Sequence, residues 1–429
     1  MSLSKDRAKR RINDLKRSES LNELELRIKN ERKSGSEKIS GVPTGGLYSR
    51  DGQLQRLKFL REKTGENIPF LEGESTFNNH QQLEGNIENF IGMTQVPTGV
   101  IGPLTVHGTC ANGDFYLPLA TTEGALVASY NRGAKATKLA GGVTSVCLIE
   151  GVQRSPLFRF ENIIEVGKFV FWILEQQGQF VELVESSSNF AQLEDVKTNI
   201  EGNEVILTFE YTTGDAAGQN MVTICTNRIC EYILEKSPVK PSRWFIESNY
   251  SGDKKATALS FSNVRGKKVT TEINIPREIV EEVLKSTPEL MVEYWKSSTL
   301  AVIQSGAIGA QGHVANGLAA LFLSCGQDVA CISEAATGIT RMQMNENGDL
   351  YCAVTLPNLI VGTVGGGTGL GTQKECLKMI GCYGKGTSRK FAEICGALAL
   401  AGELSIAAAM SAGHFTQAHK DLGRKNGKQ

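Results

Sequence analysis

The chain has 429 residues, of which 40% are hydrophobic, and its 46 Lys and Arg residues balance its 46 Asp and Glu residues. This length and composition exclude general disorder and predict about two to three domains with large buried cores. Because the chain carries no net charge, we expect no nucleic-acid partner. Glycine is frequent, at 46 residues, which is typical of loops whose backbone approaches a ligand closely.

The ten cysteines are scattered, with no Cys-x-x-Cys pair and no histidine at ligand spacing. This pattern indicates small buried side chains in a reducing, cytoplasmic compartment, and no metal site. Residues 1–33 are too charged to form a signal peptide. The most apolar segment, residues 394–412, carries Glu403 near its middle, so we expect a buried helix and no membrane span.

In chain order, residues 1–85 predict a helical N-terminal arm that contains a capping box at 20–23. Residues 156–245 combine an alternating strand pattern with two helical patterns, which favours a small α+β module of the ferredoxin-like kind, inserted into a larger unit. The expected fold class is therefore α/β (α+β), with a large domain built around a central helix from residues 86–155 and 246–429.

Two glycine-rich segments are candidates for nucleotide binding. The first, Thr212–Asn220, follows a predicted strand and opens a helix, so its backbone N–H groups could meet a phosphate. Its Asp215 is equally suited to be an ordinary helix N-cap. The second, Gly362–Gly371, has spacings close to Gly-x-Gly-x-x-Gly but lacks the rest of the Rossmann context, so a structural turn explains it as well.

Four polar groups in apolar surroundings are candidates for catalysis: Glu123, Lys254, Asp328 and His414. Each alone has a structural explanation, as a helix-start acid, a surface charge, a cap and a buried imidazole respectively. Together they would supply a proton donor, a cation for an oxyanion, an orienting acid and a second proton donor. Their spacing in the sequence does not show that they converge.

An ordered set of motifs resembles the 3-hydroxy-3-methylglutaryl-coenzyme A (HMG-CoA) reductase family over about residues 80–420, most closely the soluble catalytic part of the animal and plant type. The set comprises Glu88–Gly92, Leu117–Ser129, Gly214–Met221, Asp253–Lys255, Cys325–Asp328, Gly362–Thr368 and Ala412–His414. The resemblance implies that the thioester is reduced by two hydrides from two NADPH, or NADH, molecules. The products would be mevalonate and free coenzyme A, formed through a hemithioacetal and an aldehyde.

The resemblance also implies a role for each candidate catalytic group. Lys254 would stabilise the oxyanion that develops on the thioester carbonyl. Asp328 would lie between Lys254 and Glu123, and Glu123, partly desolvated, would donate a proton to the aldehyde oxygen. His414 would protonate the departing coenzyme A thiolate.

The resemblance also implies which residues of this chain bind the substrate, coenzyme A and the dinucleotide. The substrate contacts implied are Arg154, Asp253, Lys255 and Asn316. The coenzyme A contacts implied are Ser129, Asn131, Arg132 and Lys135. The dinucleotide contacts implied are Asp215, Ala217, Gly218, Gln219, Asn220, Gly365, Gly366, Gly367 and Thr368.

Two positions depart from the family pattern. Asn189 stands where NADPH-using relatives place an Arg for the 2′-phosphate, so another cation, Lys197 or Arg228, would have to read that phosphate. Lys420 stands where animal and plant enzymes carry a phosphorylatable Ser, so we expect no such switch.

The family also implies a homo-oligomer with active sites at the dimer interface. Two alternatives stay open: oxidation of mevalonate with NAD, which is the reverse reaction, and a coenzyme A or nucleotide-binding protein that has lost catalysis.

Overall fold

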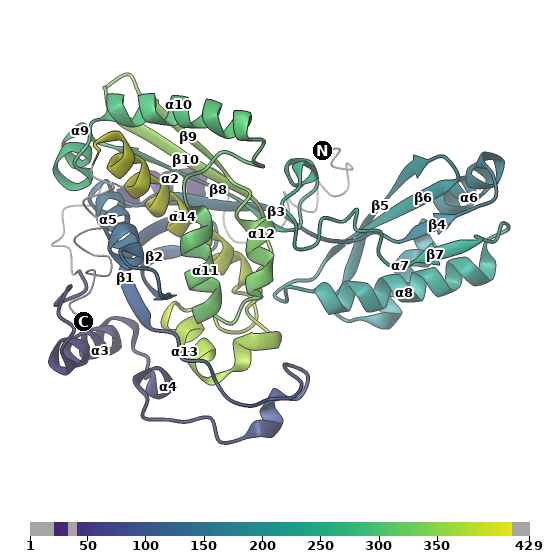
Figure 1. The fold of residues 1–429 in the computed structure, drawn as a ribbon, viewed down its shortest axis with the longest axis horizontal. Coiled ribbons are helices and arrows are strands. Elements are labelled where there is room, and N and C mark those ends of the chain that lie inside the picture. The colour runs from purple at the N-terminus through teal and green to yellow at the C-terminus, as the bar shows by residue number, and fades with distance from the viewer. Residues whose placement is uncertain (1–20, 33–40, 414–429) are drawn as a thin grey trace, which may run out of the picture.

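The computed structural model describes residues 21–32 and 41–413, which form a large body and a small body that projects from it (Figure 1). The strands of the large body are β1 (Thr98–Gly108), β2 (Asn112–Ala120), β3 (Val143–Arg154), β8 (Gly266–Ile275), β9 (Ile339–Met344) and β10 (Leu350–Leu359). Its helices are α2 (Leu21–Arg32), α3 (Arg50–Thr64), α4 (Pro69–Glu72), α5 (Leu126–Leu139), α9 (Arg277–Ile279), α10 (Pro288–Ser305), α11 (Val314–Ser324), α12 (Ile332–Ala335), α13 (Gly371–Met379) and α14 (Ser388–Ser411). The short 3₁₀ segments η4 (Val329–Cys331) and η5 (Gly366–Gly369) precede α12 and α13.

The strands of the large body form one sheet in the order β2-β1-β3-β8-β10-β9. Every neighbouring pair in it is antiparallel except β1 and β3. Helices combined with a mainly antiparallel sheet give the α+β class, and this part of the expected fold is confirmed.

The small body is an antiparallel sheet with helices packed on it and a hydrophobic core of its own. Its elements are β4 (Leu157–Arg159), α6 (Ile163–Glu175), α7 (Gln177–Ser187), β5 (Gln192–Glu201), β6 (Glu204–Thr212), α8 (Gln219–Lys236) and β7 (Arg243–Phe245), with the strand order β7-β4-β6-β5. The expectation of two helices here was wrong by one, because α6 and α7 are separate helices joined at Gln176.

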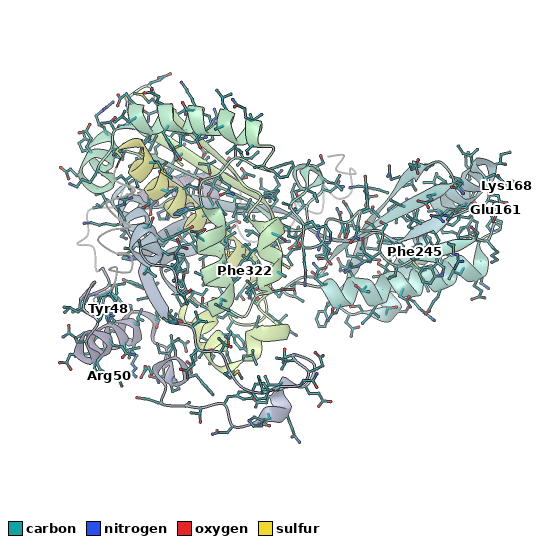
Figure 2. The ribbon with its side chains drawn as sticks, viewed as in Figure 1. Tyr48, Arg50, Glu161, Lys168, Phe245 and Phe322 are labelled. Atoms are coloured by element: carbon teal, nitrogen blue, oxygen red, sulfur yellow. The ribbon has the colours of Figure 1, made fainter. Side chains whose placement is uncertain are left out.

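Strand β3 joins the two bodies, because most of its length pairs with β8 while Val152–Arg154 pairs with β6. Figure 2 shows Glu161 and Lys168 at the far end of the small body and Phe322 inside the large one. The segments that follow β6 and β10 therefore lie near the junction of the two bodies, where backbone from both can meet.

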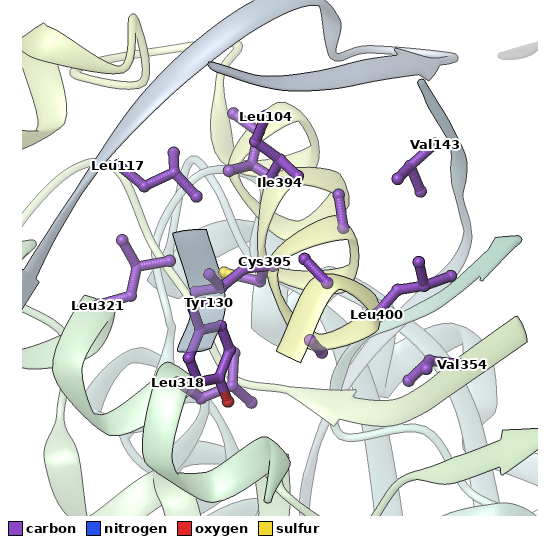
Figure 3. Close-up of a cluster of buried hydrophobic side chains, with 14 of the residues drawn as sticks. Leu104, Leu117, Tyr130, Val143, Leu318, Leu321, Val354, Ile394, Cys395 and Leu400 are labelled. Atoms are coloured by element: carbon purple, nitrogen blue, oxygen red, sulfur yellow. The ribbon is translucent and has the colours of Figure 1, made fainter. Parts of the chain in front are cut away.

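Helix α14 runs through the core of the large body, where its Ile394, Cys395 and Leu400 pack among side chains from the sheet (Figure 3). It is long and apolar enough to cross a membrane, but 83% of its most apolar stretch is buried inside the protein. Its buried Glu393 accepts hydrogen bonds from the N–H groups of Cys110 (2.8 Å) and Ala111 (2.7 Å). A buried carboxylate is tolerated where backbone donors satisfy it.

Helices α5 and α14 approach so closely that a glycine is required between them. A Cβ on Gly133 of α5 would lie 1.9 Å from the carbonyl oxygen of Ala401 in α14. Alanine in a helix is normally favoured over glycine by about 1 kcal/mol, but this clash reverses the sign. We expect Gly133→Ala to lower the free energy of unfolding by about 1–3 kcal/mol in urea denaturation.

The matched control is Gly167→Ala in α6, where no atom lies within 4 Å of the added methyl group. This variant is expected to be as stable as the parent or more stable, by up to about 1 kcal/mol. Equal effects of the two substitutions would contradict the close helix contact.

Candidate active site

The first candidate pair is Lys254 with Asp328, whose Nζ and Oδ2 atoms lie 2.8 Å apart. Lys254 lies in the loop after β7, and its backbone has a left-handed φ of 55°. Asp328 is also the N-cap of η4, where it accepts the N–H of Ala330. The hydrogen bond that Lys254 donates to the Asp328 carboxylate raises the pKa of Lys254 above its ordinary value, so the ammonium stays charged at neutral pH. It is about half-exposed and can meet a substrate.

A buried ion pair behind this loop holds Lys254 in place. Glu334 accepts the backbone N–H of Lys254 at 3.0 Å and the Nε of Arg265 at 2.8 Å. Arg265, which is 2% exposed, also donates to Asp253 Oδ1 at 2.8 Å. Sequence reasoning missed Glu334 and Arg265, since a single acid in an apolar helix and a single Arg before a strand carry no signal. Their contacts give the segment from Asp253 to Lys255 a defined position.

Arg154, at the end of β3, gathers a second polar cluster. Its Nη1 lies 3.0 Å from Glu247 and 3.5 Å from Asp253, and its Nη2 lies 3.4 Å from Gln219 Oε1. Three buried atoms of this cluster have no hydrogen-bond partner: Arg154 Nε, Gln219 Nε2 and Glu247 Oε1. Buried polar atoms are almost always satisfied, so this cluster fits a bound polar ligand. Lys255 is exposed beside it and donates to the Asp253 carbonyl at 2.9 Å.

Glu123 lies elsewhere on the large body. Its carboxylate accepts both hydrogen bonds from Asn316 Nδ2, at 3.1 and 3.0 Å. Helix α5 begins only at Leu126, after Ala125 with a φ of 68°, so the expectation that Glu123 starts this helix was wrong. Glu123 is exposed in the single chain, and its expected partial desolvation stays a prediction.

Helix α11 separates Glu123 from Asp328. Asn316 lies in the first turn of α11, and Asp328 follows the last residue, Ser324, by four positions. The eight residue steps from Asn316 to Ser324 span roughly 12 Å along the helix. Within one chain Asp328 contacts Lys254 and Glu123 contacts Asn316. The expectation that Asp328 lies between Lys254 and Glu123 stays a prediction. The fourth predicted group, His414, lies outside the described residues.

The two glycine-rich segments meet. The N–H of Thr363 donates to the carbonyl of Asp215 at 2.8 Å, and a Cβ on Gly362 would lie 2.6 Å from the nitrogen of Ala217. Gly365 and Gly366 have φ values of 75° and 53°, and a Cβ on either would meet no atom within 4 Å. This exposed backbone leaves room for a ligand.

Asp215 is not the cap of α8, which begins at Gln219 after Gly218. Its carboxylate instead accepts the N–H groups of Gly386 (2.7 Å) and Ser388 (3.1 Å). Burial opposes ionisation, but these donors outweigh it and hold the pKa of Asp215 below its usual value. The N-cap explanation of Asp215 was therefore wrong.

The family model described as hydroxymethylglutaryl-coenzyme A reductase matches residues 53–424. This chain belongs to the HMG-CoA reductase family. The HMG-CoA reductase of Pyrococcus abyssi is 43% identical over 86% of this chain and 92% of its own length, and that of Methanocaldococcus jannaschii is 39% identical over 86% and 92%.

A solved HMG-CoA reductase shares the fold. The class II enzyme of Streptococcus pneumoniae, described as bound to NADPH in open conformations, aligns with a TM-score of 0.69 at 18% identity. The alignment covers 83% of this chain and 96% of that one. The expected family membership is confirmed, whereas the archaeal relatives do not support a closer likeness to the animal and plant HMG-CoA reductases.

The expected coenzyme A contacts of the HMG-CoA reductase family lie on α5, and most of them also form hydrogen bonds with other segments of the large body. Ser129 Oγ lies 2.9 Å from Ser405 Oγ, and Arg132 donates to the Ser405 carbonyl at 2.7 Å. Asn131 accepts the N–H of Gly102 at 3.0 Å. Lys135 is exposed, so its charge faces solvent, where an anionic ligand could reach it.

Proposed function

We propose that this chain reduces HMG-CoA to mevalonate and free coenzyme A with two molecules of NADPH. The observation that carries the proposal is the Lys254–Asp328 ion pair beside the second glycine-rich segment. Gln327, next to Asp328, exchanges two hydrogen bonds with the backbone of Gly362, at 2.9 and 2.8 Å. A cation suited to an oxyanion therefore lies next to backbone suited to a dinucleotide.

Within this proposal, the two bodies bind different ligands. The large domain, residues 86–155 and 246–429, binds HMG-CoA, and the inserted domain, residues 156–245, contributes to the dinucleotide site. When bound, the nicotinamide supplies hydride to the substrate carbonyl. Lys254 stabilises the negative charge that develops on its oxygen, and Asp328 keeps Lys254 in position. Arg154, Asp253, Lys255 and Asn316 hold the acyl part of the substrate.

Glu123 is the proposed donor of the proton that neutralises the alkoxide of the second reduction, and His414 that of the coenzyme A thiolate. Asp215, Ala217, Gly218, Gln219 and Asn220 form one wall of the dinucleotide site, and Gly365, Gly366, Gly367 and Thr368 form the other. We also propose a cytoplasmic, reducing setting, because all ten cysteines are free.

A rate measurement tests the proposal directly. Incubation with HMG-CoA and NADPH should oxidise about two molecules of NADPH for each free thiol released. The reverse assay, with mevalonate, coenzyme A and NAD, addresses the alternative direction. No oxidation of either reduced cofactor in the presence of HMG-CoA would contradict the proposed activity.

We further propose that two chains complete each active site, since α11 separates Glu123 from Lys254 within one chain. Co-expression of Lys254→Ala and Glu123→Gln chains should then restore about a quarter of the parental activity, because each mixed dimer has one intact site. If a site draws both residues from one chain, the mixture stays as inactive as the separate variants.

A further inference from the structure

A lysine on the large body faces an exposed aromatic ring on the small one. The ammonium of Lys385 lies 5.8 Å from the centroid of the Phe190 ring. Phe190 is 60% exposed and directly follows Asn189. Lys385 comes from the loop between α13 and α14, Gly381–Gly386, which we term the lysine loop. The Lys385 ammonium therefore lies near Asn189, the position where NADPH-using relatives place an Arg.

Both glycine-rich segments hold the lysine loop in place. Asp215, in the first segment, binds the N–H of Gly386 on one side of Lys385. Thr363, in the second, exchanges hydrogen bonds with Gly384 on the other side, through its carbonyl at 3.0 Å and its hydroxyl at 2.9 Å. Any dinucleotide that lies along these two segments therefore also lies near a loop whose path they determine.

The two cations expected from the sequence already have carboxylate partners. Lys197 Nζ lies 2.6 Å from Glu210 Oε1, whose side chain is 4% exposed, and Arg228 Nη1 lies 3.2 Å from Glu231. Within residues 21–32 and 41–413, Lys385 is exposed and its contact is with the Phe190 ring, with no carboxylate in ion-pair range. It can pair with a phosphate without first losing an acidic partner.

We propose that Lys385 binds the 2′-phosphate of NADPH and so determines the preference for NADPH over NADH. The inference rests on the proposed function and deepens it. A 2′-phosphate carries nearly two negative charges at neutral pH, and NADH, which lacks it, gains nothing from this lysine. Lys385 discriminates between the cofactors without taking part in hydride transfer.

The test is Lys385→Gln, assayed with HMG-CoA and each reduced cofactor. Loss of a charge-assisted contact should lower kcat/KM for NADPH by about ten- to a hundredfold, while kcat/KM for NADH stays within about twofold. The control is Lys374→Gln. Its ammonium also lies over an aromatic ring, 5.3 Å from that of Tyr383, but this change should leave the NADPH:NADH ratio unaltered.

Two further measurements separate recognition from structure. Calorimetric titration with 2′,5′-ADP and with 5′-ADP should show a preference for 2′,5′-ADP in the parent that Lys385→Gln removes. Adding Asn189→Arg to Lys385→Gln should restore NADPH efficiency by about tenfold or more, because a guanidinium then stands beside Phe190.

Several outcomes would overturn the inference. A parallel loss with both cofactors would make Lys385 a structural residue. An unchanged ratio would show that the phosphate is read elsewhere, as would a parent that already favours NADH or binds both ADP isomers equally. Failure of the proposed function would give a different result, because a parent without reductase activity would oxidise neither cofactor. The titration with the two ADP isomers needs no reaction and measures only whether Lys385 contributes to binding of the 2′-phosphate.

Discussion

Lys254→Ala is expected to lower kcat for HMG-CoA reduction by about 10²–10³-fold or more. The ammonium is the one preorganised positive charge proposed for the developing oxyanion, and removal of a single oxyanion donor has effects of this size. Lys254→Arg should fail as well, because a planar guanidinium does not reproduce a compact charge held at 2.8 Å from Asp328. Activity of either variant within tenfold of the parent would remove Lys254 from the mechanism.

The control for this prediction is Lys285→Ala. Lys285 is also an exposed lysine with a left-handed backbone, at a φ of 60°, so alanine imposes the same conformational demand there. It caps the segment Val280–Leu284, which follows α9, and is not among the residues proposed for the site. Parental activity of Lys285→Ala, with similar melting temperatures for both variants, would assign the loss in Lys254→Ala to chemistry.

Glu123→Gln is expected to block the second reduction, which is the step that needs its proton. The amide retains an oxygen that can accept from Asn316, so the local contact at 3.0 Å survives, but it cannot release a proton. General-acid catalysis is worth about 10²–10⁴-fold. The rate of reduction of free mevaldate, the aldehyde intermediate, should therefore fall by this factor, together with the rate of the overall reaction.

The control is Glu84→Gln, which makes the same change at another exposed glutamate and should leave both rates at the parental level. If Glu123→Gln reduced mevaldate at the parental rate, the proton donor would be another group. A loss confined to HMG-CoA reduction would instead assign Glu123 to the first hydride transfer.

Much of the local structure could be predicted because it depends on neighbouring residues. The alternation over 204–211 predicted β6, observed as Glu204–Thr212. The apolar stretch around Glu403 predicted the buried helix α14, in which Glu403 accepts the N–H groups of Gly312 and His313 at 2.7 and 2.8 Å. The glycine pattern also identified both segments that meet at the junction of the bodies.

The boundaries near the site were predicted less well, for a shared physical reason. Helix α5 begins three residues later than Glu123, and α8 four residues later than Asp215. In both cases a residue with positive φ, Ala125 or Gly218, precedes the helix. Neither helix has a side-chain cap at its start, so no local pattern of capping residues indicates these boundaries.

By itself, the sequence determined the family, the α+β class and the residue types that the chemistry requires. Only the tertiary structure decided which of them meet. It paired Lys254 with Asp328, placed Glu123 at the other end of α11, and brought Asp215 to Gly386 across the chain. These contacts join segments tens to hundreds of residues apart, and their partners are selected by packing of the sheet and α14, which no local periodicity encodes. The contact between Lys385 and Phe190 is also of this kind, because the two residues come from different bodies that are brought together only in the folded chain.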